Sequence, residues 1–243
     1  MKLFRIILPA VALAAASFAT PALADAITLG SGDVGTSYSF TFDGFSDGTT
    51  ISGLTGAATF TLTGVTATGY TFDYSVTNTT SSPLTSRISS FAFNTDPNIS
   101  SATSTGAFAY TTLNSNYPNG IGTVDVCFKD AQTGSCAGGG SGGLTQGQTG
   151  TGSLTLNFSQ PLTSLTLSDF FDRYQSITGA GNVSSASGSG TLTSTSTSTS
   201  TGGTNVPEPG MLGLMAGAGA AMMLLRRRRR DDGADRSLIP AYA

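Results

Sequence analysis

The sequence predicts an all-β protein whose body is an antiparallel β-sandwich or jelly roll, preceded by a signal peptide and followed by a single transmembrane helix. Charged residues make up only 10% of the chain, and glycine, serine and threonine dominate it. Runs in which apolar and small polar residues alternate recur between turn-forming clusters. Helix-favouring lysine, glutamate and glutamine are scarce. These three observations favour strands throughout the body.

The first 24 residues have the parts of a secretory signal peptide. Lys2 and Arg5 are basic, residues 6–18 form an apolar run, and Ala22 and Ala24 form a small-x-small cleavage site. An uncleaved signal anchor is the alternative, but the apolar run is too short for a good membrane span. We therefore expect cleavage after Ala24 and export from the cytoplasm.

The body, residues 25–183, is expected to contain seven or eight short strands. The clearest is residues 70–77, in which apolar residues occupy one face and polar residues the other. The Ser-Leu-Thr-Leu sequences at 153–156 and 164–167 are interpreted as one hairpin. The other segments with this alternation are Tyr38 to Asp43, Ala58 to Thr63, Gly122 to Lys129, Ser153 to Phe158 and Leu165 to Ser168, with weaker candidates at Ile88 to Phe93 and Ala107 to Leu113.

The chain between the signal peptide and the tail is acidic. Residues 25–205 contain ten aspartates and three basic residues, Arg87, Lys129 and Arg173, so the net charge is −7. Such a surface repels phosphate backbones, and nucleic acid is therefore not an expected partner. A body of this length is expected to have one core.

Cys127 and Cys136 are the only two cysteines. In an exported chain they are expected to form a disulfide. A zinc site is the alternative. Without any histidine, however, two thiolates cannot complete a tetrahedral site unless a second chain contributes ligands.

The composition argues against catalysis. The chain contains no histidine, which excludes serine and cysteine triads of the usual type. No glutamate precedes Glu208, so a glycosidase would need two aspartates, and these mostly flank turns. Asp43 to Gly48 resembles a calcium loop only weakly, because Phe45 and Leu54 stand where oxygen ligands are needed. A looser calcium site remains open, and we expect no enzyme and no cofactor.

Arg173 lies among Asp169, Phe170, Phe171, Asp172 and Tyr174. Aromatic faces beside paired polar groups are typical of a sugar-binding shelf. The structural alternative is favoured: Arg173 forms a local ion pair while Phe170 or Phe171 packs in the core.

The C-terminal segments do not look like parts of a fold. Residues 184–205 are nearly all serine, threonine and glycine, and are expected to form a flexible stalk. In residues 206–230, Pro207, Glu208 and Pro209 precede the apolar run 211–225, which reaches only about 22 Å as a helix. Five arginines follow it, Arg226, Arg227, Arg228, Arg229 and Arg230, and are expected to stop transfer and stay cytoplasmic.

This tail resembles the C-terminal sorting domain of PEP-CTERM proteins. The resemblance implies export by a Gram-negative bacterium and processing by the membrane transpeptidase exosortase. Residues 231–243 depart from the pattern, in which the chain usually ends soon after the basic cluster, and are expected to be a cytoplasmic extension. The segments 124–130, 136–140 and 164–177 also resemble the cistern group of these proteins, which implies no activity.

Two functions follow as expectations. The first is a structural or adhesive component of the extracellular matrix, associated with exopolysaccharide or biofilm. It would be anchored transiently in the inner membrane before it reaches the cell surface or the medium. The second is a carbohydrate-binding module without catalysis, which an aromatic shelf on a solvent-facing strand would favour.

Overall fold

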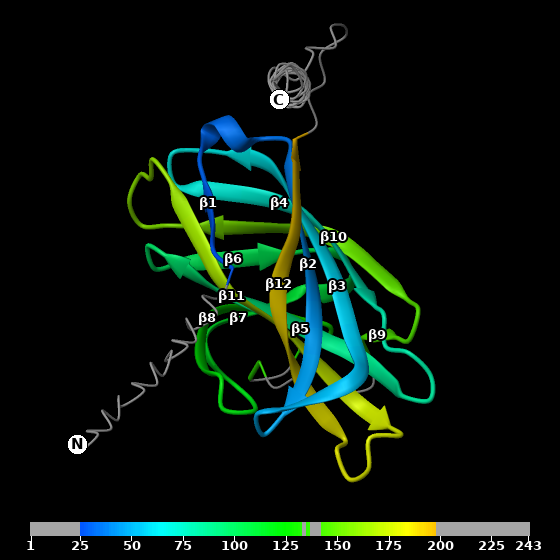
Figure 1. Cartoon of the computed structure of the whole chain (residues 1–243). Helices are drawn as coiled ribbons and strands as arrows, with labels where there is room; N and C mark the ends of the chain where they lie inside the picture. The colour runs from blue at the N-terminus through cyan, green and yellow to red at the C-terminus, as the bar shows by residue number, and fades with distance from the viewer. Residues whose placement is uncertain (1–24, 133–134, 137–141, 198–243) are drawn as a thin grey trace, which may run out of the picture. The chain divides into compact units, whose positions relative to one another are not determined.

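The computed structural model describes residues 25–132, 135–136 and 142–197. These residues form one twelve-stranded antiparallel sheet that is nearly closed into a barrel (Figure 1). The prediction of an all-β, antiparallel body is confirmed. The elements are β1 (Ile27–Leu29), η1 (Ser31–Asp33), β2 (Thr36–Ser46), β3 (Thr49–Val65), β4 (Gly69–Asn78), β5 (Thr85–Asp96), β6 (Ser101–Ser104), η2 (Gly106–Phe108), β7 (Tyr110–Tyr117), β8 (Gly122–Lys129), β9 (Leu144–Thr145), β10 (Thr149–Asn157), β11 (Leu165–Thr178) and β12 (Ser185–Thr197), where η denotes a 3-10 helix.

The strands form one curled sheet and not the two face-to-face sheets of a sandwich or jelly roll. The order is β6-β10-β4-β3-β2-β12-β11-β5-β8-β7, with β1 added to β11 and β9 to β5. The two end strands approach each other, and the Thr111 hydroxyl donates to the Ala102 carbonyl oxygen at 3.2 Å. The register of β11 against β5 shifts at three points. Bulges bend and twist a strand, which helps the sheet to curl.

Aromatic side chains fill the interior of the curled sheet. Phe40 stacks on Phe170 with ring centroids 4.1 Å apart, and Phe91 stacks on Phe128 at 5.0 Å. Phe60 packs against a member of each pair. These five rings come from β2, β11, β5, β8 and β3, so their burial joins distant parts of the sheet into one core.

Residues 185–197 form β12 and not the flexible stalk expected over residues 184–205. β12 lies between β2 and β11 and pairs with both (Figure 1). The expectation is therefore wrong for β12, while residues 198–205 lie outside the described part of the chain. The composition led to the wrong expectation because threonine is common in polar linkers but, being β-branched, also favours strands.

The glycines of β12 mark close packing. A Cβ atom at Gly188 would overlap a carboxyl oxygen of Asp172. A Cβ atom at Gly190 would lie 2.9 Å from Cβ of Phe170 and 3.0 Å from the ring of Phe42. Real Cβ contacts are longer than this, so only glycine fits where β12 crosses the core side chains of β11 and β2.

The other strand predictions differ in accuracy. β8 has the predicted bounds, and β4 extends the predicted segment by one residue at each end. The predicted hairpin is wrong, because β10 pairs with β4 and β6 while β11 pairs with β1, β5 and β12. The repeated Ser-Leu-Thr-Leu sequence reflects similar burial patterns in two separate strands, not their pairing.

Candidate functional site

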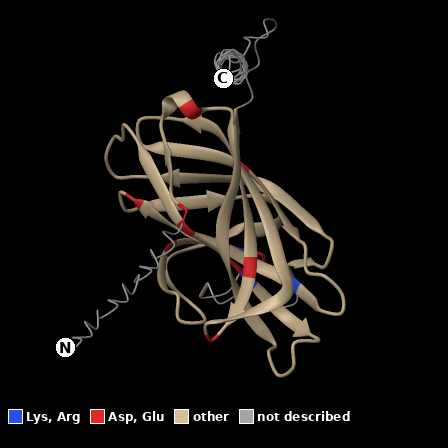
Figure 2. Cartoon of the chain, in the orientation of Figure 1, with Lys and Arg blue, Asp and Glu red and all other residues tan. Residues whose placement is uncertain are grey.

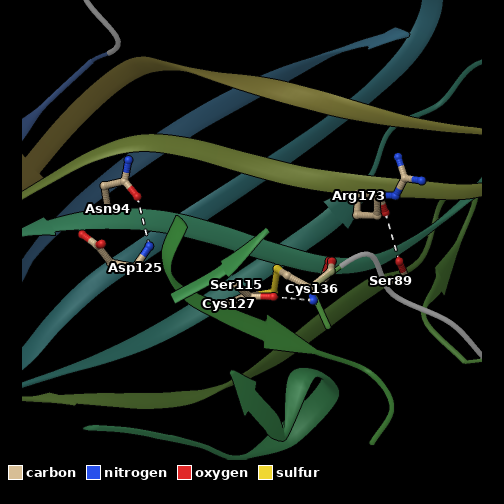
Figure 3. The surroundings of a disulfide bond; sticks show 8 residues. Ser89, Asn94, Ser115, Asp125, Cys127, Cys136 and Arg173 are labelled. Atoms are coloured by element: carbon tan, nitrogen blue, oxygen red, sulfur yellow. Dashed lines mark hydrogen bonds between the residues drawn. A yellow bond between two sulfur atoms is a disulfide. The ribbon is translucent and has the colours of Figure 1, made fainter. Parts of the chain in front are cut away.

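The disulfide predicted between Cys127 and Cys136 is present (Figure 3). The two Cα atoms are 5.9 Å apart, and both residues are fully buried. They belong to a small apolar cluster with Ala92, Tyr117 and Val124. Ala92 lies between core residues of β5, so this cluster occupies the other face of that strand. It explains why β5 is buried on both faces.

Polar contacts hold the disulfide loop against the sheet. The amide N–H of Cys136 donates to the Ser115 hydroxyl at 3.0 Å (Figure 3). The Ser90 hydroxyl donates to the Cys136 carbonyl oxygen at 3.3 Å. Arg87 forms an ion pair with Asp130 at 3.5 Å. Burial raises the pKa of Asp130, and the charge of Arg87 opposes this shift. The arrangement is a structural clamp built from one covalent bond and one partly desolvated ion pair.

Replacing both cysteines by alanine is expected to lower the free energy of unfolding by about 2.7 kcal/mol, because the bridge closes a loop of about ten residues in the unfolded chain. Urea unfolding of the protein, followed by far-ultraviolet circular dichroism, measures the change. Wild-type protein with reductant is the control for the side-chain replacement. An unfolding midpoint that neither treatment changes would contradict the prediction.

The residues around Arg173 do not form a sugar-binding shelf. Phe170 packs in the main core, whereas Phe171 tilts against Tyr117 at 5.7 Å on the other face of β11. Arg173 is 6% exposed, and its Nη2 donates to the Ser185 hydroxyl at 2.9 Å. The structural alternative for Phe170 is confirmed. Among the described residues, the exposed large apolar side chains are Val34 and Tyr110. Tyr110, at the start of β7, is a single exposed ring and does not make a shelf of several aromatic faces.

The aspartates that were candidates for calcium binding or glycosidase chemistry lie in strands and turns, where they serve the fold. Asp43 lies within β2, and Asp47 and Gly48 form the turn to β3 with positive φ angles of 48° and 75°. Asp125 accepts from the Thr95 amide at 2.8 Å, and its own amide donates to Asn94 at 3.1 Å (Figure 3). No group of three or more metal-binding side chains occurs among the described residues.

Asp172 is the most unusual titratable group of the described body. It is fully buried on the core side of β11, and its carboxyl oxygens lie against Gly56 and Gly188. No basic side chain forms an ion pair with it among the described residues. Burial raises the pKa of Asp172 well above its usual range, and contacts with Tyr174 and the amides of Asp172 and Gly188 offset only part of the shift.

A pocket of about 520 Å³ lies at one end of the curled sheet, and we call it the end pocket. Its wall combines η1, the turn between β3 and β4, and the segment before β11. The sequence did not reveal it, because these segments are far apart in the chain and carry no recognisable motif. The end pocket is lined by Ser31, Val65, Thr66, Ala67, Tyr70, Leu162 and Thr163.

The end pocket has a hydroxyl-rich but uncharged wall. Tyr70 is fully buried, and its ring meets Phe158 edge-on at a centroid distance of 6.2 Å. Among the described residues, its hydroxyl has no hydrogen-bond partner. Burial raises the pKa of Tyr70, and the negative charge of Asp33 raises it further. The Tyr70 hydroxyl therefore stays protonated.

Comparison of the chain with models of known protein families, with curated protein sequences and with solved structures finds no significant match. The cleavage residues Ala22 and Ala24, the Pro207-Glu208-Pro209 motif, the apolar run 211–225 and Arg226 to Arg230 all lie outside the described residues. Within residues 25–197, apart from the gaps noted above, no helix has the length and apolar character needed to cross a membrane.

Proposed function

We propose that this chain is an exported, non-catalytic β-domain protein that works at the cell surface or in the extracellular matrix. The observation that carries the proposal is the buried disulfide of an otherwise hydroxyl-rich all-β body. Disulfides persist in oxidising compartments, where the proposed signal peptide would deliver the chain. The PEP-CTERM-like tail makes exosortase the proposed processing partner, with the inner membrane as a transient site.

The surface chemistry supports an association with exopolysaccharide or biofilm. Hydroxyl side chains pair across neighbouring strands, as in Ser37 with Thr61 at 2.7 Å and Thr77 with Thr149 at 2.8 Å. Charged side chains are sparse over the strands (Figure 2). Arg87, Lys129 and Arg173 are buried, so the described surface offers no exposed cation for nucleic acid. Such a face suits many weak contacts with neutral, hydrated polymers.

A carbohydrate-binding module without catalysis is the second candidate. An aromatic shelf on a solvent-facing strand was the feature that would favour this candidate, and the described strand faces have no such shelf. The end pocket supports it in a different form, because it is a concave site with several hydroxyl groups.

The intact mass of the protein from cells with and without exosortase tests the proposal. We expect a mature N-terminus at Asp25 in both, and loss of Arg226 to Arg230 only when exosortase is present. The mass also reports any glycan or attached anchor. A mature protein that begins at Met1 would contradict export by this signal, and an arginine cluster retained in exosortase-positive cells would contradict the sorting role.

A further inference from the structure

The second half of β12 has a neighbouring strand on one side only. Its pairing with β11 ends at Ser189, which lies opposite Phe171, whereas its pairing with β2 continues to Thr197. Beside the first residues of β11, the place of β12 is taken by β1 (Figure 1). β12 therefore leaves β11 half-way along its length and continues as an edge strand.

The open edge of β12 begins just after Leu192. The Leu192 amide donates to the carboxylate of Asp25, which closes the inner end of the edge. No other described strand pairs with the far side of Thr193 to Thr197, and all five of these side chains are exposed. We call this stretch the β12 edge. Backbone N–H and C=O groups along such an edge can pair with a further strand.

The β12 edge lacks the usual features that prevent edge-to-edge pairing. Exposed edge strands commonly carry lysine, proline or an inward-pointing charge. Residues 191–197 read Thr-Leu-Thr-Ser-Thr-Ser-Thr and contain no charge, proline or glycine. A register shift against β2 lies between Leu192 and Ser194, and the pairing from Ser194 to Thr197 is then regular. The edge is thus extended, uncharged and open.

The side chains of the β12 edge indicate which strand fits it. Where strands meet at the surface of this fold, hydroxyl groups pair across them, as in Thr36 with Thr197 at 3.2 Å and Thr77 with Thr149 at 2.8 Å. A second β12 edge, laid antiparallel, would place a threonine or serine opposite each threonine or serine of the first. A strand with charged or bulky apolar side chains would not form these pairs.

We propose that the β12 edges of two copies of this chain pair antiparallel about a two-fold axis, which joins the two curled sheets. The interface is isologous, because the same residues contribute from both copies. The ladder is short, and the net charge of −7 opposes the approach of two bodies, so the dimer is weak and reversible. The proposal concerns the described body alone and depends on neither export nor exosortase.

Single-cysteine variants of the full chain in detergent test the proposal. The two native cysteines are bonded to each other, so an added cysteine supplies the one reactive thiol. Cysteine is placed singly at each of residues 193–197, and the variants are oxidised alone and in pairwise mixtures. Facing residues of an antiparallel pair have Cβ atoms about 4.5–5.5 Å apart, which is close enough for a disulfide. We expect covalent dimers only between positions whose residue numbers add to one constant sum.

Two further variants separate edge pairing from other contacts. Thr195→Lys brings like charges together across the edge and should weaken the dimer about fivefold in sedimentation equilibrium. Thr41→Lys adds the same charge on the outward face of β2 and should leave the dimer unchanged. Thr41→Cys measures the background of random collisions.

Three results would overturn the proposal. The first is cross-linking that is no stronger at any edge position than at Thr41. The second is a constant difference between the residue numbers of productive pairs, which indicates parallel strands. The third is an association that Thr195→Lys leaves unchanged, because another part of the chain would then hold the copies together.

Discussion

A fragment of residues 25–183 is expected to remain unfolded, whereas a fragment of residues 25–199 is expected to fold as an autonomous β domain. The first fragment lacks β12, which occupies a central position in the sheet order. Ten registered residue pairs join β12 to β2 and five join it to β11. With a net worth of roughly 0.5–1.5 kcal/mol for each hydrogen bond, these ladders are comparable to the whole stability of a domain, about 5–15 kcal/mol.

Far-ultraviolet circular dichroism and thermal unfolding of the two fragments measure the effect. The longer fragment should give a β-type spectrum and a cooperative transition, and the shorter one neither. A third fragment, residues 25–199 with Leu192→Ala, controls for simple loss of apolar area and should still fold, because Leu192 is only partly buried. Cooperative unfolding of the 25–183 fragment would show that the domain folds without β12, and would contradict the prediction.

The sequence predicted strands well where one face is apolar. In β4, Tyr70, Phe72, Tyr74 and Val76 alternate with polar residues, and all four are buried. β12 lacks this signal, because Ala186, Gly188 and Gly190 stand on its close-packed stretch and contribute almost no apolar side chain. At these positions only a small residue fits against the neighbouring strands. In the sequence, glycines that close packing requires cannot be distinguished from the glycines of a disordered segment.

The sequence predicted the presence of the strands better than it predicted which strands are neighbours in the sheet. Alternation places residues on a face but does not identify the neighbouring strand, so β10 and β11 were wrongly paired. Two cysteines leave one intramolecular pairing, and with the expectation of export this made the disulfide predictable. The end pocket combines Ser31, Tyr70 and Thr163 from three distant segments, and only the folded chain brings them together.

Asp172→Asn is expected to stabilise the folded protein at neutral pH and to flatten the dependence of its stability on pH. The folded-state pKa of Asp172 is raised by burial above its value in the unfolded chain. The folded state therefore binds the proton more tightly. Stability is fully present below the unfolded pKa, near 4, and is lost as pH rises toward the folded pKa. Asparagine keeps the shape of the side chain and removes this loss.

The surroundings of Asp172 make the carboxylate form costly. Burial raises the pKa of the Tyr174 and Tyr117 hydroxyl groups, and the negative charge of Asp172 raises both further. Both hydroxyl groups therefore remain neutral across the pH range of the experiment. Asp43 also acts on Tyr174 and adds negative charge to the region. Asp130, whose pKa burial also raises, is the group that would leave a residual slope in the variant.

Thermal midpoints of wild type, Asp172→Asn and Asp73→Asn between pH 4 and pH 9 test this expectation. The wild-type midpoint should fall as pH rises, and the Asp172→Asn midpoint should fall less. Each pKa unit removed corresponds to about 1.4 kcal/mol, or roughly 3–6 °C for a domain of this size. Asp73 is exposed and accepts from the Ser153 hydroxyl at 2.6 Å, so its variant should follow the wild-type profile. Parallel wild-type and Asp172→Asn profiles would mean that Asp172 ionises in the folded protein without penalty, through a partner or a water molecule beside Gly56 and Gly188.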